Sequence, residues 1–357
     1  REVLKAYQHI RTVMTRRSLF YKPYKVLTHW RDGRIHPALN QAEAVTRRYS
    51  SSSPNIQQLP KLGEGGQFRK VILPHRKDAV VVSCDFAAQE IRALAWLSKD
   101  EALLSCFLGE NPQDMHSLTA VSAAPLVWHE EVTYEEFRAM LESKDPAVKE
   151  RAKALRGQSK TTFFGAAYGA AAPKIAQTLM VEESVAQAFL DARDLSFPRI
   201  EEWKREVEAE AAQTGYATTM LGARRHLTAQ LNAEDKWDRA RGERQVGNYK
   251  IQGACAEQTK LAMAEMWRRG LFDGRYDVEF IATIHDECVA SVHRKDVVPF
   301  LREFHDCMQI PYGGMGVPIV SSISLGPSFG EQRELGEVFD ADLVQAAVDE
   351  IFGEVKG

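Results

Sequence analysis

Hydrophobic and polar positions along this chain predict both buried strands and amphipathic helices. The run AVVVSCD (79–85) places β-branched residues in front of an acid, which predicts a buried strand ending at Asp85. In the next segment, 86–98, apolar residues recur with the spacing of one helix face, and residues 101–214 continue as mostly helical. Two apolar strands are expected around the HDE triplet at 285–287. The pattern therefore predicts a chain of mixed α and β structure.

Turn signals separate the remaining segments. The serine run, Pro54 and Pro60 predict a shaped loop over 46–60, and GEGG at 63–66 predicts a turn. Thr133 with Glu136 three residues later has the pattern of a helix-capping box. The other expected elements are a helix over 1–20, a hairpin over 215–227 with its turn near Leu221 and Gly222, one long helix or two over 235–270, and a last strand over 317–326.

The composition is that of an ordinary globular protein, with 44% hydrophobic and 27% charged residues and no apolar run long enough to span a membrane. Five cysteines without a C-x-x-C pair argue against a disulfide framework or a structural zinc site. The net charge of -3 conceals an asymmetry: residues 1–50 hold eleven Lys or Arg against three acids, and residues 331–357 hold two against eight. The basic segment fits either a solvated face or a polyanion-binding surface.

Three carboxylates occupy positions where a charge is costly unless something compensates it. Asp85 ends a buried strand, while Asp286 and Glu287 lie at the tip of a strand–turn–strand. Carboxylates brought to one sheet edge suit hard divalent cations, and a pair of such ions can clamp a phosphoryl transfer. An ordinary solvated turn remains the alternative on this pattern alone. Two similar pairs, His305-Asp306 in an expected helix and Asp277-x-Glu279 on an expected surface, are not predicted to be sites.

The stretch RGQSKTTFFGAAYG (156–169) places Arg156, Lys160, Phe164 and Tyr168 four residues apart. Each four-residue step rotates a helix by about 40°, so these side chains form one slowly winding stripe. Two cations followed by two aromatics match a nucleoside triphosphate laid along a helix, with the cations expected near the helix N-terminus, where the dipole favours anions. A basic amphipathic helix with two core aromatics is the alternative.

Six blocks, in order along the chain, together resemble family A DNA polymerases, the group typified by bacterial DNA polymerase I. They are RRYSSSSPNIQQLP, DFAAQEIRALAWLS, DMHSLTA, RGQSKTTFFGAAYG, ERQVGNYKIQGACAE and TIHDEC. DFAAQEIR and TIHDEC are similar to the family's two acid motifs, and RGQSKTTFFGAAYG matches its fingers-helix motif. The resemblance covers residues from 20 to 330.

The resemblance implies an α+β right-hand polymerase fold with an antiparallel-sheet palm, helical fingers and a truncated thumb. The expected parts are a thumb remnant (1–45), palm (46–92 and 241–330), fingers (93–240) and an acidic C-terminal helix or tail (331–357). Residues 127–148 exceed the family pattern and lengthen the expected fingers.

The resemblance also implies a role for each matching position. Asp85, Asp286 and the carbonyl of Phe86 would bind two Mg²⁺ ions, with Mn²⁺ as a substitute, and Glu287 would be an auxiliary acid. The dNTP would contact Arg156, Lys160, Phe164, Tyr168, His116 and Glu90, with Lys160 protonating the leaving pyrophosphate. The expected contacts to primer-template DNA are Arg48, Asn55, Gln57, Arg244, Asn248, Gln252 and His285. The reaction would be attack of a primer 3′-OH on the α-phosphate.

Glu90 and Phe164 refine the expected substrate. Glu90 stands where the family excludes a ribose 2′-OH, which disfavours the related RNA polymerases and primases. Phe164 in place of Tyr implies poor use of dideoxynucleotides, so Phe164→Tyr is expected to raise chain termination. Ala87-Ala88-Gln89, Phe163 and Thr283-Ile284 depart from the family pattern, which leaves rate and fidelity open.

Parts of the family pattern are missing here. Most of the thumb hairpin and any exonuclease domain are absent from the sequence. We therefore expect either that the sequence is a fragment or that a separate chain supplies these parts. A processivity factor is another possible partner. A catalytically weak DNA-binding or assembly subunit is the competing hypothesis. The apolar stripe of the tail, with Asp340 or Asp342 as its cap, is expected to pack on its own body, or else to dock a partner. We expect no membrane association. We expect a cytoplasmic location, in a bacterial cell or a phage-infected host.

Overall fold

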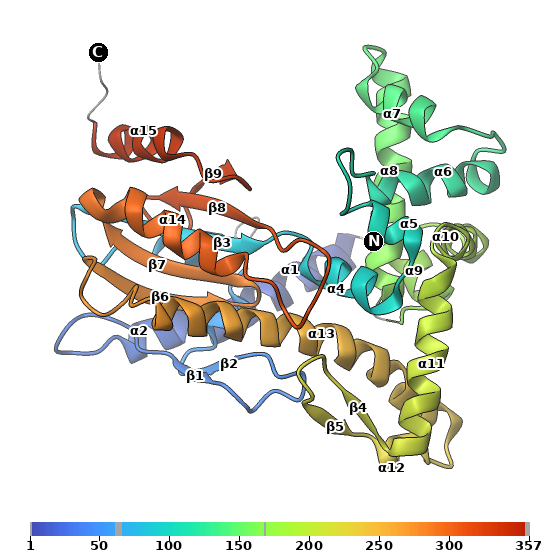
Figure 1. Cartoon of the computed structure of the whole chain (residues 1–357), viewed down its shortest axis with the longest axis horizontal. Helices are drawn as coiled ribbons and strands as arrows, with labels where there is room; N and C mark the ends of the chain where they lie inside the picture. Colours follow the sequence, from blue (N-terminus) through green and yellow to red (C-terminus); the bar gives the residue numbers. More distant parts are fainter. Residues whose placement is uncertain (1, 61–65, 168, 354–357) are drawn as a thin grey trace. The chain divides into compact units, whose positions relative to one another are not determined.

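The computed structural model describes residues 2–60, 66–167 and 169–353, which form two compact units (Figure 1). Unit 1 comprises residues 1–89, 255–312 and 319–357, and unit 2 comprises residues 90–254 and 313–318. Helices α4 (Gln89–Ser98) and α13 (Lys236–Arg268) each have residues in both units. The predicted mixture of α and β structure is confirmed.

Unit 1 is built on a five-stranded antiparallel sheet in the order β6-β7-β3-β8-β9. Its strands are β3 (Ala79–Phe86), β6 (Val278–Ile284), β7 (Glu287–His293), β8 (Ser321–Gly326) and β9 (Arg333–Gly336). The predicted strand at 79–85 is the central one, and its β-branched run is buried because β3 has neighbours on both edges. Helix α14 (Val297–Met308) packs against β3, β7 and β8. The strand predicted over 317–326 is β8, which begins at Ser321, and it is not the last strand because β9 follows it.

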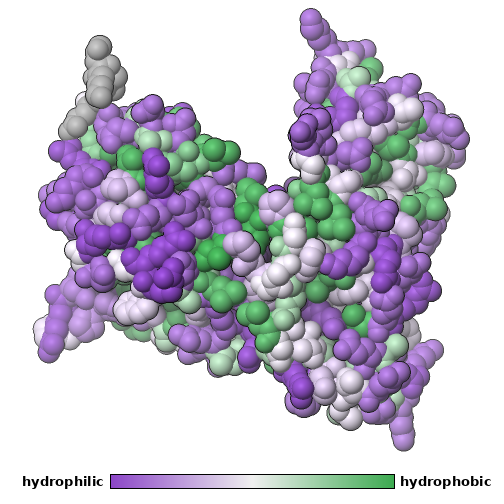
Figure 2. All heavy atoms as spheres, viewed as in Figure 1, coloured by the Kyte–Doolittle hydropathy of each residue, from purple (hydrophilic) through white to green (hydrophobic). Residues whose placement is uncertain are grey.

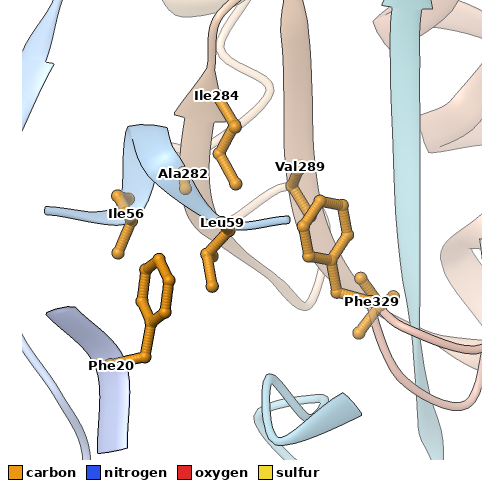
Figure 3. Packing of buried hydrophobic residues seen from close by; sticks show 8 residues of the cluster. Phe20, Ile56, Leu59, Ala282, Ile284, Val289 and Phe329 are labelled. Carbon is orange, nitrogen blue, oxygen red and sulfur yellow. The ribbon is translucent and has the colours of Figure 1, made fainter. Parts of the chain in front are cut away.

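A hydrophobic cluster fixes the segment after the serine run against the β6–β7 hairpin (Figure 3). Ile56 and Leu59, in and next to the short helix η2 (Ile56–Gln58), meet Phe20 and the strand residues Ala282 and Ile284. The same cluster includes Val81, Val289 and Phe329. The cluster therefore places η2 beside the turn that carries the HDE triplet.

The N-terminal segment is more regular than its sequence predicts. Helices α1 (Glu2–Arg16), η1 (Arg17–Tyr21) and α2 (Lys22–Leu27) carry helical structure past residue 20. The expected loop over 46–60 contains η2 and the strand β2 (Ser50–Ser52), which pairs with β1 (Ala38–Asn40). Cross-strand pairing overrides the turn preference of the serines here. Helix α3 (Gln67–Lys70) follows, and residues 63–65 of the expected GEGG turn lie outside the described residues.

Unit 2 is mostly helical, as expected. It contains α5 (Glu101–Ser105), α6 (Met115–Val127), α7 (Tyr134–Glu142), α8 (Pro146–Ala167), α9 (Ala172–Leu179), α10 (Glu183–Ser196), α11 (Pro198–Thr214) and α12 (Thr228–Leu231), with the hairpin β4 (Tyr216–Thr218) and β5 (Arg224–His226). The capping box of Thr133 and Glu136 and the hairpin are confirmed, and α13 is one continuous helix. Phe137, Leu155 and Phe189 pack with alanines of α6 in a core shared by α6, α7, α8 and α10.

The acidic C-terminus forms helix α15 (Ala341–Phe352), capped by Asp340 through the backbone amides of Asp342 and Leu343. Val344, Ala347 and Val348 are buried, and the helix contacts α14 and β8. The favoured expectation, a tail that packs on its own body, is confirmed. Among the described residues no helix is both long and apolar enough to cross a membrane, and hydrophilic side chains cover much of the face drawn in Figure 2.

Candidate active site

The two predicted metal-binding acids of unit 1 lie near the end of β3 and in the turn that precedes its neighbour β7. Asp85, near the end of β3, is the register partner of Glu287 at the start of β7, and Asp286 precedes Glu287 in the turn. The backbone N–H of Phe86 donates to the carbonyl of Asp286 at 3.2 Å. Asp85 and Asp286 are partly exposed, while Phe86 is buried. Backbone pairing therefore brings these carboxylates to one sheet edge, as the sequence predicts.

Glu287 has a different environment from the two aspartates. Its carboxylate pairs with the guanidinium of Arg69 at 3.3 Å, and both side chains are 9% exposed. Arg69 also donates to the carbonyls of Leu59 and Pro60 and lies over the ring of Phe329. A buried ion pair with additional hydrogen bonds is costly to break by removing one partner. Arg69 was not predicted, and Glu287 is held by a cation rather than left as an open acid.

Gln57 fixes the turn between β6 and β7. Its side-chain amide donates to the carbonyl of Thr283 at 2.5 Å and accepts from the backbone N–H of His285 at 2.7 Å. Asn55 in turn accepts from the backbone N–H of Gln57 at 3.1 Å and caps η2. Gln57 is 8% exposed. The Gln57 amide is thus buried and bonded within the protein, and its contact with DNA stays a prediction.

Arg48, His285 and Asp286 line one small pocket of unit 1, together with Gln89 and Ala256. His285 has φ 57°, a left-handed conformation that a tight turn requires of it. Although His285 is exposed in its turn, partial desolvation lowers its pKa, and the nearby positive charges of Arg48 and Arg69 lower it further. The lowered pKa favours the neutral imidazole. The amide of Gln89 bonds to the Cys255 carbonyl and the Gln258 side chain, which fixes the start of α4.

In unit 2, Arg156 on α8 is held by an acid that the sequence analysis missed. Asp114 accepts from Nε of Arg156 at 2.7 Å and from Nη2 at 2.9 Å, a bidentate pair. Burial favours the protonated carboxyl, but hydrogen bonds from Arg156 and Ser117 outweigh it and lower the pKa of Asp114 to about 2. Asp114 opens the DMHSLTA block, and its place at a helix start was the signal available in the sequence.

His116 lies two residues after Asp114 and is 9% exposed. Its ring contacts those of Phe163 and Phe164, with centroids 6.4 and 5.9 Å away. Burial lowers the pKa of His116 to about 4; Asp114 opposes this shift, and the charges of Arg156 and Lys160 add to it. Two predicted nucleotide-binding positions, His116 and Phe164, are thus in contact.

The predicted stripe on α8 is present, but its place in the helix corrects one argument. The helix begins at Pro146, so Arg156 and Lys160 lie several turns after its N-terminus, where the dipole effect has faded. Lys160 is exposed, Arg156 and Phe164 are half-buried, and Phe163 is a core residue against Phe197. Anion binding here depends on the side-chain cations. Tyr168 lies outside the described residues.

A second small pocket joins four predicted site residues of unit 2. Glu90, Phe164, Asn248 and Gln252 line it, with apolar neighbours that include Leu94. Arg244, another predicted residue, lies exposed over Gly169, whose φ of 79° and lack of a side chain admit its methylenes. A carboxylate and an aromatic ring sharing one pocket can sort ligands by their shape and hydroxyl groups.

The two acid pairs that were not predicted to be sites have structural partners. Asp277 pairs with Arg76 at 2.6 Å, and Glu279 pairs with Arg34 on an exposed surface. His305 is buried in α14, where its ring bonds to the carbonyl of Ser321. The predicted helix around His305 and the predicted exposure of Glu279 are confirmed, and the expectation that neither pair is a site stays a prediction.

Comparison with known proteins agrees with this architecture. The family model described as DNA polymerase family A matches residues 1–331. Relatives include the thermostable DNA polymerase I of Thermus aquaticus, 30% identical over 89% of this chain and 35% of the relative, and DNA polymerase I of Bacillus subtilis, 30% identical over 84% and 31%. The chain thus spans about a third of the length of these relatives.

A solved structure is similar in fold to most of this chain. It is the POL domain of Pol1 from M. smegmatis in complex with DNA primer-template and dNTP, with a TM-score of 0.71 and 27% identity over 87% of this chain and 50% of that one. The family model covers most of the chain and the fold matches that of a polymerase domain. This chain therefore belongs to DNA polymerase family A.

Proposed function

We propose that this chain catalyses template-directed DNA synthesis, joining deoxynucleotides to a primer 3′-OH. The observation that carries the proposal is the placement of Asp85 and Asp286 at one sheet edge. The backbone N–H of Phe86, the residue after Asp85, donates to the carbonyl of Asp286. Carboxylates on a rigid sheet can hold reacting groups to the precision that phosphoryl transfer requires.

The donor set at this edge fits divalent metal ions. Two carboxylates and a backbone carbonyl, from Asp85, Asp286 and Phe86, are hard oxygen ligands of the kind that Mg²⁺ prefers, with Mn²⁺ as a substitute. When bound, a pair of such ions would stabilise charge on the attacking and leaving oxygens. Asp85 and Asp286 would hold the ions, and Glu287, paired with Arg69, would keep the sheet edge in shape.

Unit 2 would bind the incoming dNTP. Arg156, Lys160 and His116 would contact the triphosphate, and the exposed Lys160 would donate a proton to the departing pyrophosphate. Phe164 would pack on the sugar, with Glu90 in the same pocket excluding a ribose 2′-OH. The placement of Tyr168 at the template end stays a prediction.

Each unit carries residues predicted to contact primer-template DNA. Arg48, Asn248 and Gln252 would touch the minor groove near the primer end. His285 would also contact DNA, and Arg244 would support the template or the palm. Asn55 and Gln57 would also contact DNA, and within the protein they hold the turn of His285. We assign residues 46–92 and 241–330 to the palm, 93–240 to the fingers and 1–45 to a thumb remnant, with 331–357 as the tail.

Primer extension on a primed template with Mg²⁺ tests the proposal, with dNTPs and rNTPs in parallel reactions. We expect extension with dNTPs only, abolished in Asp286→Ala. Retained DNA binding with no extension by the wild-type chain, even at high enzyme concentration, would instead favour a DNA-binding subunit.

A further inference from the structure

Helix α7 lies in the segment 127–148 that lengthens the expected fingers, and one of its side chains reaches the Asp114–Arg156 pair. The hydroxyl of Tyr134, the first residue of α7, accepts the backbone N–H of Asp114 at 2.7 Å. Thr133 and Glu136 cap α7, and Phe137 is fully buried in the core with Leu155 of α8. Tyr134 is therefore held by a capped and packed helix.

The carboxylate of Asp114 makes three contacts. It caps α6 through the backbone N–H of Ser117 at 3.0 Å, accepts the Ser117 hydroxyl, and binds Arg156 through both of its oxygens. The acid side chain is 22% exposed, against 37% for Arg156. A bidentate pair fixes the plane of the guanidinium and leaves its Nη1 group for another anion. The orientation of Arg156 is thus set by the start of α6.

We propose that Tyr134 and Asp114 are positioning residues that hold Arg156 ready for the triphosphate. Helix α7 is then a support of the nucleotide-binding site. This inference rests on the proposed function, because it takes Arg156 as a triphosphate contact. Removing the Tyr134 hydroxyl leaves the Asp114 amide without that acceptor, which loosens the residue that orients Arg156.

Competition between Asp114 and the substrate for Arg156 would predict the opposite change in dNTP binding. If the carboxylate competed with the triphosphate for Arg156, weakening the pair would tighten dNTP binding. If it holds Arg156 in place, weakening the pair makes the cation adopt more orientations, and binding weakens. The direction of the change in KM for dNTP separates these cases: a fall indicates competition, and a rise indicates positioning.

Single-nucleotide incorporation on primed DNA is the test, with KM and kcat measured separately for each variant. Asp114→Asn keeps a good helix cap but removes the charge, and we expect KM for dNTP to rise about tenfold, equivalent to 1.4 kcal/mol, with a smaller change in kcat. Tyr134→Phe is expected to raise KM about threefold, because it loosens Asp114 without removing its charge.

Tyr276→Phe is the matched control, since it also loses a tyrosine hydrogen bond, to Glu303 at 2.8 Å, in unit 1. Its KM should equal that of the wild type.

A double-mutant cycle tests whether Asp114 acts through Arg156. In the Arg156→Ala background, Asp114→Asn should have no further effect on KM. An equal effect in both backgrounds, a lowered KM, or unchanged KM values in an active enzyme would each overturn the inference. Thermal melting of each variant identifies any that fail to fold, in which case Tyr134→Phe carries the test. Failure of the proposed function differs, because the wild-type chain itself would then not extend a primer.

Discussion

The sheet edge of unit 1 and the helices of unit 2 that we propose to bind the nucleotide are built in different ways. In unit 1, the backbone sets the positions of Asp85 and Asp286 through strand register and the Phe86–Asp286 hydrogen bond. In unit 2, side chains on separate helices hold one another, as in the Asp114–Arg156 pair and the contact of His116 with Phe164. A side-chain change at Asp85 or Asp286 should therefore remove a carboxylate without moving its neighbours.

The same difference predicts how substitutions act in unit 2. There a change removes a contact and also releases the residue that the contact positioned. We expect losses in unit 1 to appear in kcat and to be large, and losses in unit 2 to be graded and to appear first in KM or in selectivity.

The largest expected effect separates two acids that are register partners on the same sheet. Asp85→Asn should lower kcat at least about 1000-fold, since a metal pair contributes several kcal/mol to the transition state. Glu287→Gln should lower it about tenfold or less, because that carboxylate is paired with Arg69. Single-turnover extension on saturating DNA measures both. Equal losses in the two variants would show that Glu287 is itself a metal ligand.

A smaller effect is expected on sugar selectivity. Glu90 lines one pocket with Phe164, so Glu90→Ala should open room for a 2′-OH. The preference for dNTP over rNTP, as a ratio of kcat/KM values, should fall about 100-fold. Glu110→Ala, at an exposed position of the same unit, should leave the ratio unchanged. A ratio that stays constant in Glu90→Ala would locate the sugar elsewhere.

Next comes the amide that ties η2 to the β6–β7 turn. Gln57→Ala removes two hydrogen bonds to the backbone at 283 and 285 and should cost about 1–3 kcal/mol of stability. Because the turn also carries Asp286, kcat should fall about tenfold at the same time, equivalent to about 1.4 kcal/mol. Urea unfolding and extension kinetics measure the two effects. Its exposed neighbour offers the control, Gln58→Ala, for which neither quantity should change.

Much of this architecture could be predicted because its signals are local. The buried strand before Asp85, the HDE turn and the capping box at Thr133 each depend on residues close together in the chain. The pairings of Arg69 with Glu287 and of Arg156 with Asp114 join residues 218 and 42 positions apart, and no periodicity encodes them. The bonds of Gln57 to the β6–β7 turn join residues 226 and 228 positions apart, and the sequence did not reveal them for the same reason.

The start of α8 shows a further limit of local reasoning. The motif RGQSKTTFFGAAYG has a recognisable pattern, but the helix that carries it begins ten residues earlier, at Pro146. The position of a motif within its helix depends on where capping and packing start that helix, which the motif itself does not contain.

The smallest effect concerns pH and tests how unit 2 holds His116. Burial lowers the folded-state pKa of His116 to about 4, below its usual 6.5. Between these values the unfolded chain binds a proton that the folded chain does not, so this contribution to stability is present near neutral pH and is lost as pH falls from 6.5 towards 4. His116→Gln cannot titrate, so its melting temperature should fall less than that of the wild type between pH 7 and pH 5.

Asp114 does not obscure this window, because hydrogen bonds keep its pKa near 2 and its usual value of 3.8 already lies below pH 4. The comparison requires the same buffer series for both proteins, since every other titrating group then cancels in the difference. Parallel melting curves for the wild type and His116→Gln would mean that His116 is as well solvated in the folded chain as in the unfolded one. Its contact with Phe164 would then be too loose to align the imidazole with a phosphate, and the graded behaviour expected of unit 2 would have to come from Arg156 and Lys160 alone.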